Sequence, residues 1–578
     1  MTKAKQIYKT RVSIITSSNA ENTKDIVQAE ANPFNRVTLI SCAAVSLVFA
    51  GLLSFWFAYD ARQPSMDEAG HILCAFRFAD LFNHPHILKG KWWFELLMVN
   101  NFYPPAVYAF NGFLKVLLGP GHFVDWLSLA VYDFILTASV FATTLVLTRR
   151  HFAAIAASVV VNFYTDVVGF SRTYLLDFQV VAMIALGLFC LVFWRDKPTW
   201  KRTIAGGIAL ALVLASKQIA GAFLAGPGIY YFVSILMERR GNWKVQLGQL
   251  ATMALIAGLS MVPWAMASYG FISEFAETNK KVITSTVGAI SVPEALQRGV
   301  RYYTFRLPEM MSPILLGAFI LSLLFCAKNT HVKLLPAILS AVVGIVLISL
   351  LPWQYPQTRY GMGGLIAAAI YTGAFFDQIW ELKFPPVPTL PRLAVGLVGL
   401  VICLQYLSFC YFPYPFDKPG FMVAFSDFTG QKLAKLGMEK MGKSTPEPYA
   451  DWGQKWALEV IGKRDPDLPV WLNVMANHVE YNPHTFSLQA KYIGSVVKPT
   501  SSRTWTVLGD TVTFSKQSAL YYQWYLIKTG DTGHTLLNQE SRQANDNLLQ
   551  FVRDSGKFEL MAQKDVPDGS KIYLYRQR

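Results

Sequence analysis

The stretch "SRTYLLDFQ" (residues 171–179) places an arginine and an aspartate between two apolar runs. These runs, near 152–170 and 177–194, approach the length of about 20 residues that a helix needs to cross a bilayer. Charged side chains at such a depth are costly unless they are paired or solvated, so they often mark functional sites. Arg172 and Asp177 therefore predict a membrane protein with a site at the ends of its spans.

The composition agrees with a chain that crosses the membrane many times. Of 578 residues, 53% are hydrophobic and 15% are charged, whereas ordinary soluble domains have roughly 25% charged residues. The net charge of +15 resembles that of a nucleic-acid-binding protein. However, most Lys and Arg residues of the first 400 positions lie in short loops between apolar runs, which is a topology signal. We therefore expect a polytopic α-helical membrane protein and no nucleic-acid partner.

The apolar runs predict about eleven transmembrane helices and one helix on the membrane surface. Assigning the basic loops to the cytoplasm places the N-terminus inside and the C-terminus outside. The run at 106–118 would be only roughly 20 Å long as a helix, and counting it as a span would put Arg149 and Arg150 outside the cytoplasm. We therefore expect it to lie along the membrane surface in the first exoplasmic loop. The predicted spans are 37–59, 123–147, 152–170, 177–194, 203–216, 219–237, 245–267, 310–327, 334–352, 359–376 and 392–412.

A change in composition near residue 413 predicts a separate domain. The chain becomes polar there, with strand-like runs at 468–475 and 570–577 and a helical run at 545–556. This part is expected to be a soluble exoplasmic α/β domain. The predicted organisation is a cytoplasmic tail (1–35), a transmembrane catalytic domain (36–412) with long exoplasmic loops near 60–122 and 268–309, and the soluble domain (413–578).

Several charged residues are predicted to share the exoplasmic face of the membrane. A carboxylate there can take a proton from a hydroxyl, and cations can hold a phosphate. A second carboxylate can share a divalent ion with the first. These residues are Asp67, Glu68, Arg172, Asp177, Lys217 and Arg359.

Each of these residues also has a structural interpretation, which the sequence leaves open. Asp67 and Glu68 are typical of a helix cap, and Asp177 would suit the start of the next helix. Lys217 fits a polar turn between two spans, and Arg359 fits an anchor at the membrane interface. His71 is expected on a solvated helix face rather than on a metal.

Five motifs, in this order, resemble those of a known family. They are "MDEAGH" (66–71), "FYPPAVYAF" (102–110), "SRTYLLDFQ", "ASKQIAGAF" (215–223) and "YPQTRYGMGGLIAAAI" (355–370). Together they resemble the GT-C glycosyltransferases, in particular the group with protein O-mannosyltransferases and bacterial aminoarabinose transferases. The resemblance covers the layout of about the first 410 residues, and it rests on the order of the motifs and their shared membrane side.

The resemblance implies an inverting glycosyltransferase that uses a polyprenyl-phosphate sugar. A monosaccharide would pass to an acceptor hydroxyl outside the cytoplasm, and the acceptor would be a glycolipid, a polysaccharide or a protein. Tyr103 stands where some members have a lysine, and Arg301 is a second loop residue that would contact donor or acceptor. By the same resemblance, Asp67 is the general base with Glu68 beside it, Asp177 orients the base or shares a divalent metal ion with Asp67, and Arg172, Lys217 and Arg359 bind the donor phosphate.

Two other function classes remain open from the sequence. One is a transporter of lipid-linked glycans, which would need polar residues through the membrane midplane. The other is a polymerase of lipid-linked repeats. The chain has no N-x-S/T sequence, which favours a location in the inner membrane of a bacterium, with the C-terminal domain in the periplasm.

Overall fold

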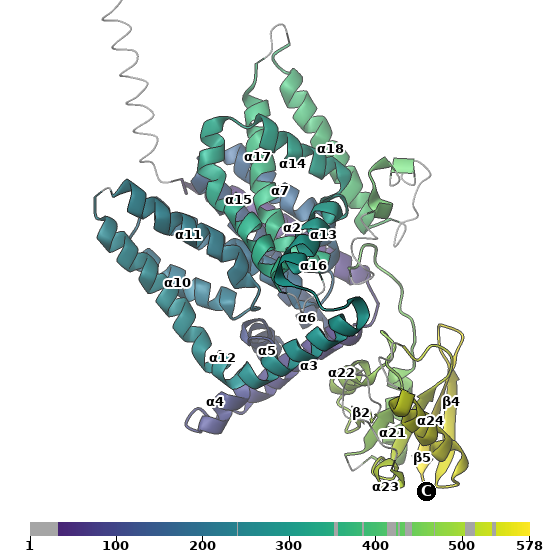
Figure 1. Ribbon diagram of the computed structural model, residues 1–578. Helices are drawn as coiled ribbons and strands as arrows, with labels where there is room; N and C mark the ends of the chain where they lie inside the picture. Colours follow the sequence, from purple (N-terminus) through teal and green to yellow (C-terminus); the bar gives the residue numbers. More distant parts are fainter. Residues whose placement is uncertain are drawn as a thin grey trace, which may run out of the picture.

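A computed structural model shows a bundle of helices with a sheet domain at one end (Figure 1). The predicted tail of residues 1–35 lies almost wholly outside the described residues. The structure describes residues 33–578 except 240, 352–355, 384–386, 413–423, 426–427, 434–441, 467–468, 503–514 and 534–538.

Among the described residues, eight helical segments are long and apolar enough to cross a membrane. They agree with eight of the predicted spans, and they support an integral membrane protein. The segments are α2 (Arg36–Tyr59), α6 (His122–Thr148), α9 (Leu176–Asp196), α11 (Ala220–Glu238), residues Trp243–Lys281 of α12 (Trp243–Val287), α15 (Lys328–Ser349), the run Thr358–Glu381, and α18 (Leu390–Cys410). The run Thr358–Glu381 comprises α16 (Thr358–Gly361), the short helix η1 (Met362–Gly364) and α17 (Leu365–Glu381).

The other three predicted spans differ from straight membrane-crossing helices. The run 152–170 forms α7 (His151–Phe163) and α8 (Thr165–Ser171), which meet at 65° because the backbone is extended at Tyr164. The run 310–327 begins at Pro313, where α13 (Val292–Met311) and α14 (Pro313–Phe325) meet at 117°. The third, α10 (Trp200–Leu214), has 15 residues, fewer than the about 20 needed. The described residues thus contain eight to ten candidate spans rather than eleven.

The first long connection, near 60–122, is mostly helical. It contains α3 (Met66–Asn83), α4 (Gly90–Leu97) and α5 (Ala106–Leu118), and α5 coincides with the predicted surface helix. Helices α3 and α5 approach closely at Gly112, where an added Cβ would lie 2.5 Å from the Cβ of Phe78. This contact fixes the position of α3, which carries Asp67 and Glu68.

The second connection, near 268–309, was expected to be a loop and is helical instead. Helix α12 has 45 residues, or about 68 Å at 1.5 Å per residue, far more than a hydrocarbon core of about 30 Å. Its last turns therefore extend beyond the membrane and, with α13, form this connection. The sequence carries a signal for this helix that the prediction did not use, because residues 271–287 contain no glycine or proline that would end it.

The C-terminal part contains the predicted α/β domain. Its five strands are ordered β2-β1-β3-β5-β4, with β1 parallel to β2 and β3, and β5 antiparallel to β3 and β4. The strands are β1 (Trp471–Val474), β2 (Lys498–Thr500), β3 (Trp524–Lys528), β4 (Phe558–Asp565) and β5 (Lys571–Gln577). The helices are α21 (Gln454–Arg464), α22 (Pro483–Ile493), α23 (Lys516–Ala519) and α24 (Gln539–Asp554).

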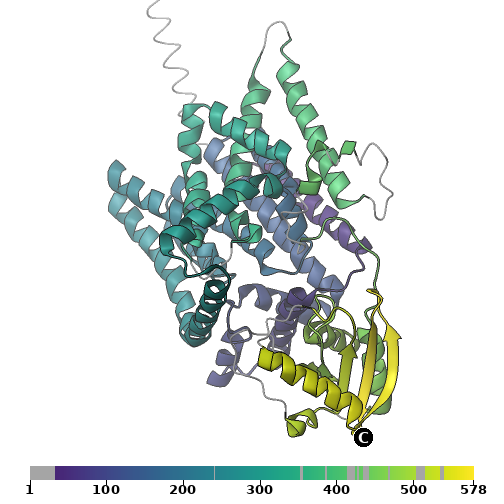
Figure 2. The same cartoon turned by 45° about the vertical axis from the view of Figure 1, so that its right-hand side comes forward.

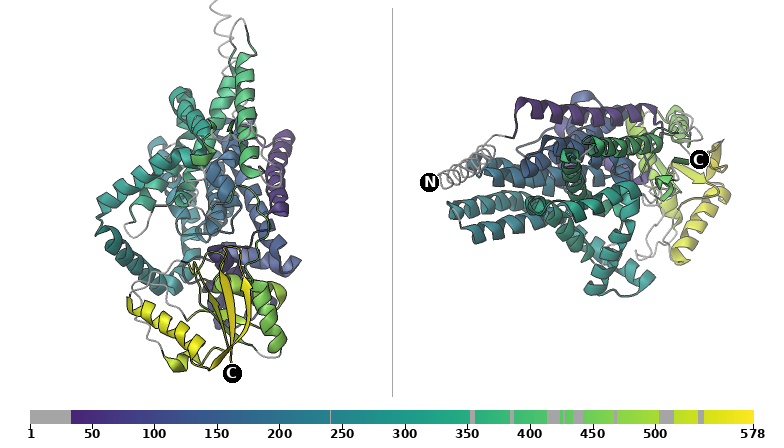
Figure 3. Two further views of the ribbon diagram at one scale, coloured as in Figure 1. Left: turned by 90° about the vertical axis from the view of Figure 1, so that its right-hand side faces the viewer. Right: turned by 90° about the horizontal axis from the view of Figure 1, so that it is seen from above.

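Helices cover both faces of this sheet (Figures 2 and 3). On one face Ile461 of α21 packs with Leu472 and Leu574 of the strands. On the other face Val552 of α24 packs with Ile527. The alternation of inward and outward residues in β3 thus buries side chains on both sides, as is usual for a sheet between helices.

The sheet domain is joined to the end of α2 and the starts of α3 and α6. Trp56 Nε1 donates to the Ser444 carbonyl oxygen at 2.9 Å, at the end of α2. The Met66 N–H donates to the Val479 carbonyl oxygen at 2.9 Å, and the Tyr492 hydroxyl donates to Asp125 Oδ2 at 2.8 Å. The sheet domain therefore lies at the end of the bundle where the predicted site residues gather.

Candidate functional site

Three predicted site residues from distant segments meet in one buried cluster. Lys217 Nζ lies 2.6 Å from Asp177 Oδ1, and Arg359 lies 3.7 Å from Asp177 Oδ2. Asp177 is in the first turn of α9, Lys217 in the turn between α10 and α11, and Arg359 in α16. Asp177 and Lys217 are only 3% and 5% exposed. Two cations therefore share one carboxylate, which leaves the cluster with excess positive charge.

Aromatic rings surround the cations of this cluster. Lys217 Nζ lies 5.3 Å from the ring centre of Tyr103 and 5.0 Å from that of Tyr360. Burial opposes the charge of Lys217, but Asp177 and the two tyrosines outweigh it and raise the pKa of this amine. Lys217 is therefore held as a cation, and Tyr103 faces the cluster.

Arg359 retains hydrogen-bonding capacity for a ligand. One of its terminal nitrogens donates to the Tyr360 hydroxyl at 3.3 Å. Its buried Nε–H has no hydrogen-bond partner among the residues that the structure describes. An unpaired buried donor on a cation is unfavourable by itself, so this group suits an incoming anion.

A cavity of about 430 Å³ opens beside the cluster. Lys217, Tyr103 and Tyr360 form one part of its wall, and Gln218 and Gln357 add polar groups. The opposite wall is apolar and comes from the outer part of α12, including Ile272, Phe275 and Ile283. The cavity thus pairs a cationic end with an apolar side, as an anionic head group on a hydrocarbon chain would require.

Glu68 is a buried structural hub rather than a free acid. Its carboxylate accepts from the backbone N–H groups of Ser65 and Tyr174, each at 2.9 Å, and from Lys443 Nζ at 2.9 Å. Burial would raise the pKa of Glu68, but Lys443 and the two N–H groups outweigh burial and lower it. The helix-cap interpretation therefore describes Glu68, since Ser65 and Glu68 form the capping box of α3.

Lys443 is a site residue that the sequence analysis missed. It lies in the segment that leads into the sheet domain, 266 residues after Asp177. Its backbone N–H donates to the Gly169 carbonyl oxygen at 3.0 Å. Its ammonium pairs with Glu68 and also lies 5.7 Å from the ring centre of Trp126. A single lysine in a polar segment gives no signal by which the sequence could identify this pairing.

Asp67 lies beside Glu68 but faces different neighbours. Among the residues that the structure describes, none forms a hydrogen bond or ion pair with its carboxylate. The helical spacing places it on the same face of α3 as His71, four residues later. His71 Nδ1 lies 2.8 Å from the Tyr108 hydroxyl, so the predicted solvated helix face is wrong. The charge of the Asp67 carboxylate acts on His484 of the sheet domain, and the role of Asp67 as a base stays a prediction.

The structure keeps His71 neutral. Burial lowers its pKa to about 3, with a further lowering contribution from Lys217. Its ring and that of Tyr103 have centres 5.7 Å apart, so His71 forms part of the wall behind the cluster. A neutral imidazole adds no positive charge there and leaves the cationic character to Lys217 and Arg359.

Arg172 and Arg301 lie apart from this cluster. Arg172 donates to the Val168 carbonyl oxygen at 2.5 Å and lies 3.1 Å from Cys410 Sγ. Arg301 lies on α13, 5.6 Å from the ring centre of Phe305, and lines a different cavity. Their binding roles stay predictions, because the structure gives both residues other surroundings.

The predicted metal pair, Asp67 and Asp177, does not fit a divalent-ion site in this arrangement. Both oxygens of Asp177 already face cations, Lys217 and Arg359. Among the described residues, no group of three or more His, Cys, Asp or Glu side chains is placed to hold a metal ion.

Comparison with known proteins supports the resemblance seen in the sequence. Residues 127–279, which include Asp177 and Lys217, match the family model of the dolichyl-phosphate-mannose-protein mannosyltransferases. This match confirms the predicted resemblance to GT-C glycosyltransferases and indicates a glycosyltransferase. No curated protein is significantly similar in sequence to this chain.

Several solved glycosyltransferase structures are similar to this chain. ArnT from Cupriavidus metallidurans, in a crystal structure bound to undecaprenyl phosphate, has 12% identity and a TM-score of 0.48, over 93% of this chain and 97% of that chain. The arabinofuranosyltransferase AftD from Mycobacteria has 13% identity and a TM-score of 0.46, over 93% of this chain and 40% of that chain. The arabinosyltransferase EmbB from Mycobacterium smegmatis has 12% identity and a TM-score of 0.37, over 69% of this chain and 38% of that chain.

Proposed function

We propose that this protein transfers a monosaccharide from a polyprenyl-phosphate carrier to an acceptor hydroxyl, with inversion at the anomeric carbon. The observation that carries the proposal is the cavity beside Lys217, with a cationic end and an apolar wall from α12. Lys217 and Arg359 would hold the phosphate by charge-assisted hydrogen bonds. The prenyl chain would lie along Ile272 and Phe275.

The proposed step is a single displacement. The acceptor oxygen forms a bond to the anomeric carbon while the bond from that carbon to the phosphate oxygen breaks. Polyprenyl phosphate leaves with the bonding electron pair, and its charge is balanced by Lys217 and Arg359. Asp67 takes the proton of the acceptor hydroxyl. Asp177 positions both cations and keeps them charged in a buried place.

A transfer assay with purified protein tests this function. The protein is supplied with polyprenyl-phosphate monosaccharides and with glycolipids extracted from bacterial envelopes as acceptors. We expect a glycosylated product together with released polyprenyl phosphate, and the same assay after treatment with a chelator tests whether a metal is needed. Donor binding without consumption of any donor would favour a transporter of lipid-linked glycans instead.

The proposed reaction takes place on the exoplasmic side, which cysteine labelling can test. In a background without the six native cysteines, single cysteines are placed at the exposed positions Thr199, Gly241, Leu88 and Lys516. We expect an impermeant reagent in intact cells to label Leu88→Cys and Lys516→Cys only, because basic loops near Thr199 and Gly241 belong inside. Labelling of Thr199→Cys and Gly241→Cys instead would reverse the proposed orientation.

A further inference from the structure

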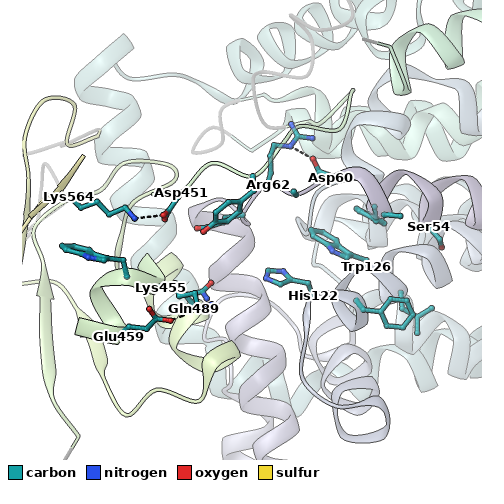
Figure 4. Close-up of a pocket in the computed structure, with 18 residues that line it drawn as sticks. Ser54, Asp60, Arg62, His122, Trp126, Asp451, Lys455, Glu459, Gln489 and Lys564 are labelled. Atoms are coloured by element: carbon teal, nitrogen blue, oxygen red, sulfur yellow. Dashed lines mark hydrogen bonds and ion pairs between the residues drawn. The ribbon is translucent and has the colours of Figure 1, made fainter. Parts of the chain in front are cut away.

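A second, larger cavity lies between the helical bundle and the sheet domain (Figure 4). Its volume is about 1050 Å³, which is at the upper end of the range for small-molecule sites. The bundle contributes the end of α2 and the start of α6, and the sheet domain contributes α21 and residues near it. Neither Lys217 nor Arg359 lines it, so it is distinct from the cavity proposed for the donor.

The two walls of this cavity differ in polarity. Phe57, Phe123 and Leu127 belong to helices α2 and α6 where these helices reach the end of the bundle, and Phe123 is 71% exposed. The facing wall, from the sheet domain, carries charged side chains such as Lys455 and Glu459 beside Trp456 and Gln489. A ligand that fits both walls has an apolar part at the level of the membrane surface and a polar part above it.

The charges that line this cavity are balanced. Arg62 lies 2.7 Å from Asp60, and Lys564 lies 2.6 Å from Asp451, as the dashed lines in Figure 4 mark. Lys455 Nζ lies 3.9 Å from Glu459, one helical turn later, and forms a third, weaker pair. Among the lining residues that the structure describes, each lysine and arginine thus has a carboxylate partner of its own, whereas Lys217 and Arg359 share one carboxylate. The cavity suits a head group without net charge.

The cavity is connected to the proposed catalytic residues through two routes. Gln63 lines it and precedes Asp67 by four residues, and Gln63 Nε2 lies 3.2 Å from the hydroxyl of Tyr449, another lining residue. Trp126 lines it as well, and its ring lies next to the ammonium of Lys443, which pairs with Glu68. A molecule in this cavity would therefore lie next to the segment that leads to the proposed base.

We infer that this cavity binds the acceptor, and that the acceptor is a membrane-anchored glycolipid whose sugar head group carries no net charge. This inference rests on the proposed function. The lipid would lie along the apolar wall, and the sugar would stack on indole rings such as Trp456 and hydrogen-bond to Gln489. A protein acceptor is disfavoured, because the apolar wall lies at the level where the spans emerge from the membrane.

Binding of defined lipids to the full-length protein in nanodiscs tests the inference without requiring turnover. The probes are a diglycosyl diacylglycerol, the same lipid carrying a phosphate on its sugar, and the free disaccharide. We expect the uncharged glycolipid to bind at least about tenfold more tightly than either of the others. Equal binding of the free disaccharide, or tighter binding of the phosphorylated lipid, would overturn the inference.

Two variants assign the binding to this cavity, each with a matched control. Trp456→Ala should weaken glycolipid binding by about tenfold or more, the scale for a central aromatic contact, whereas Trp471→Ala on β1 should not. Glu459→Lys, on the exposed face of α21, gives the lining a net positive charge with little risk to folding and should strengthen binding of the phosphorylated lipid, whereas Glu540→Lys on α24 should not. Unchanged binding in both cavity variants would place the glycolipid elsewhere.

The same experiment separates this inference from the proposed function. Donor binding is measured in parallel as stabilisation by polyprenyl phosphate, which neither cavity variant should change. Transfer to another acceptor, with no glycolipid bound here, would reject the inference and keep the glycosyltransferase. Glycolipid binding here without any transfer would keep the site and reject the proposed function.

Discussion

Asp67→Asn is expected to lower the rate of sugar transfer by at least about a hundredfold, because it removes the proposed base. Asparagine keeps the shape of the side chain and its place in the first turn of α3. Phosphate is a good leaving group, whereas the acceptor hydroxyl must lose its proton as the new bond forms. The acceptor therefore depends on a base, which typically contributes about 10²–10⁴-fold.

Single-turnover transfer and donor affinity, measured in one detergent for variant and wild type, test this expectation. Donor affinity should not change, because the phosphate is assigned to Lys217 and Arg359. Transfer by Asp67→Asn at nearly the wild-type rate would remove Asp67 from the mechanism and leave it as a residue that favours the start of α3.

Glu68→Gln is the matched control, because it is the same kind of change one residue later. Glu68 holds Lys443 and the backbone of Tyr174, so its loss leaves a buried cation without its partner. Breaking such a pair typically costs about 3–5 kcal/mol. We therefore expect a lower unfolding temperature with a smaller loss of rate per folded molecule than in Asp67→Asn.

The meeting of Asp177, Lys217 and Arg359 could be predicted from the sequence because these residues follow the topology. Asp177, Lys217 and Arg359 each lie at the end of an apolar run, and the positive-inside rule assigns those ends to one side of the membrane. The structure brings the three side chains into contact. The helix at 106–118 was also predictable from its apolar run, and the structure has it as α5; its location on the membrane surface stays a prediction.

Side-chain direction could not be predicted in the same way. Arg172 is five residues from Asp177, but the end of α8 turns its guanidinium toward Cys410 and Tyr406. The pairing of Glu68 with Lys443 joins residues 375 positions apart. The break at Tyr164 was missed for a related reason, because no proline or glycine stands at this bend to indicate it.

Lys217→Gln and Arg359→Gln are each expected to weaken donor binding by about ten- to a hundredfold. This range corresponds to about 1.5–3 kcal/mol for a hydrogen bond to a charged group. Each change removes one positive charge from a cluster in which two cations share a single carboxylate. The cluster without the excess charge no longer favours a phosphate, so the loss should exceed that from removing a neutral hydrogen bond.

The measurement is the thermal stabilisation of each variant by polyprenyl phosphate, titrated in detergent, since a ligand that binds only the folded state stabilises it. Asp177→Asn is a control with the opposite expected effect, because it removes the negative charge of the cluster instead of a positive one. It leaves Lys217 and Arg359 without their carboxylate, so the free protein should be less stable, whereas the ligand phosphate can replace the missing charge. We expect the ligand to stabilise Asp177→Asn by more than it stabilises the wild type.

Arg172→Lys decides whether this third predicted cation belongs with Lys217 and Arg359. Its partners are Val168, Cys410 and Tyr406, and its guanidinium lies 5.1 Å from the ring centre of Trp56. Lysine cannot reproduce the planar contacts of the guanidinium, so the unfolding temperature should fall while stabilisation by polyprenyl phosphate persists. If the ligand instead stabilised Lys217→Gln and Arg359→Gln as well as the wild type but failed to stabilise Arg172→Lys, the donor phosphate would lie at Arg172. The cavity beside α12 would then need another ligand.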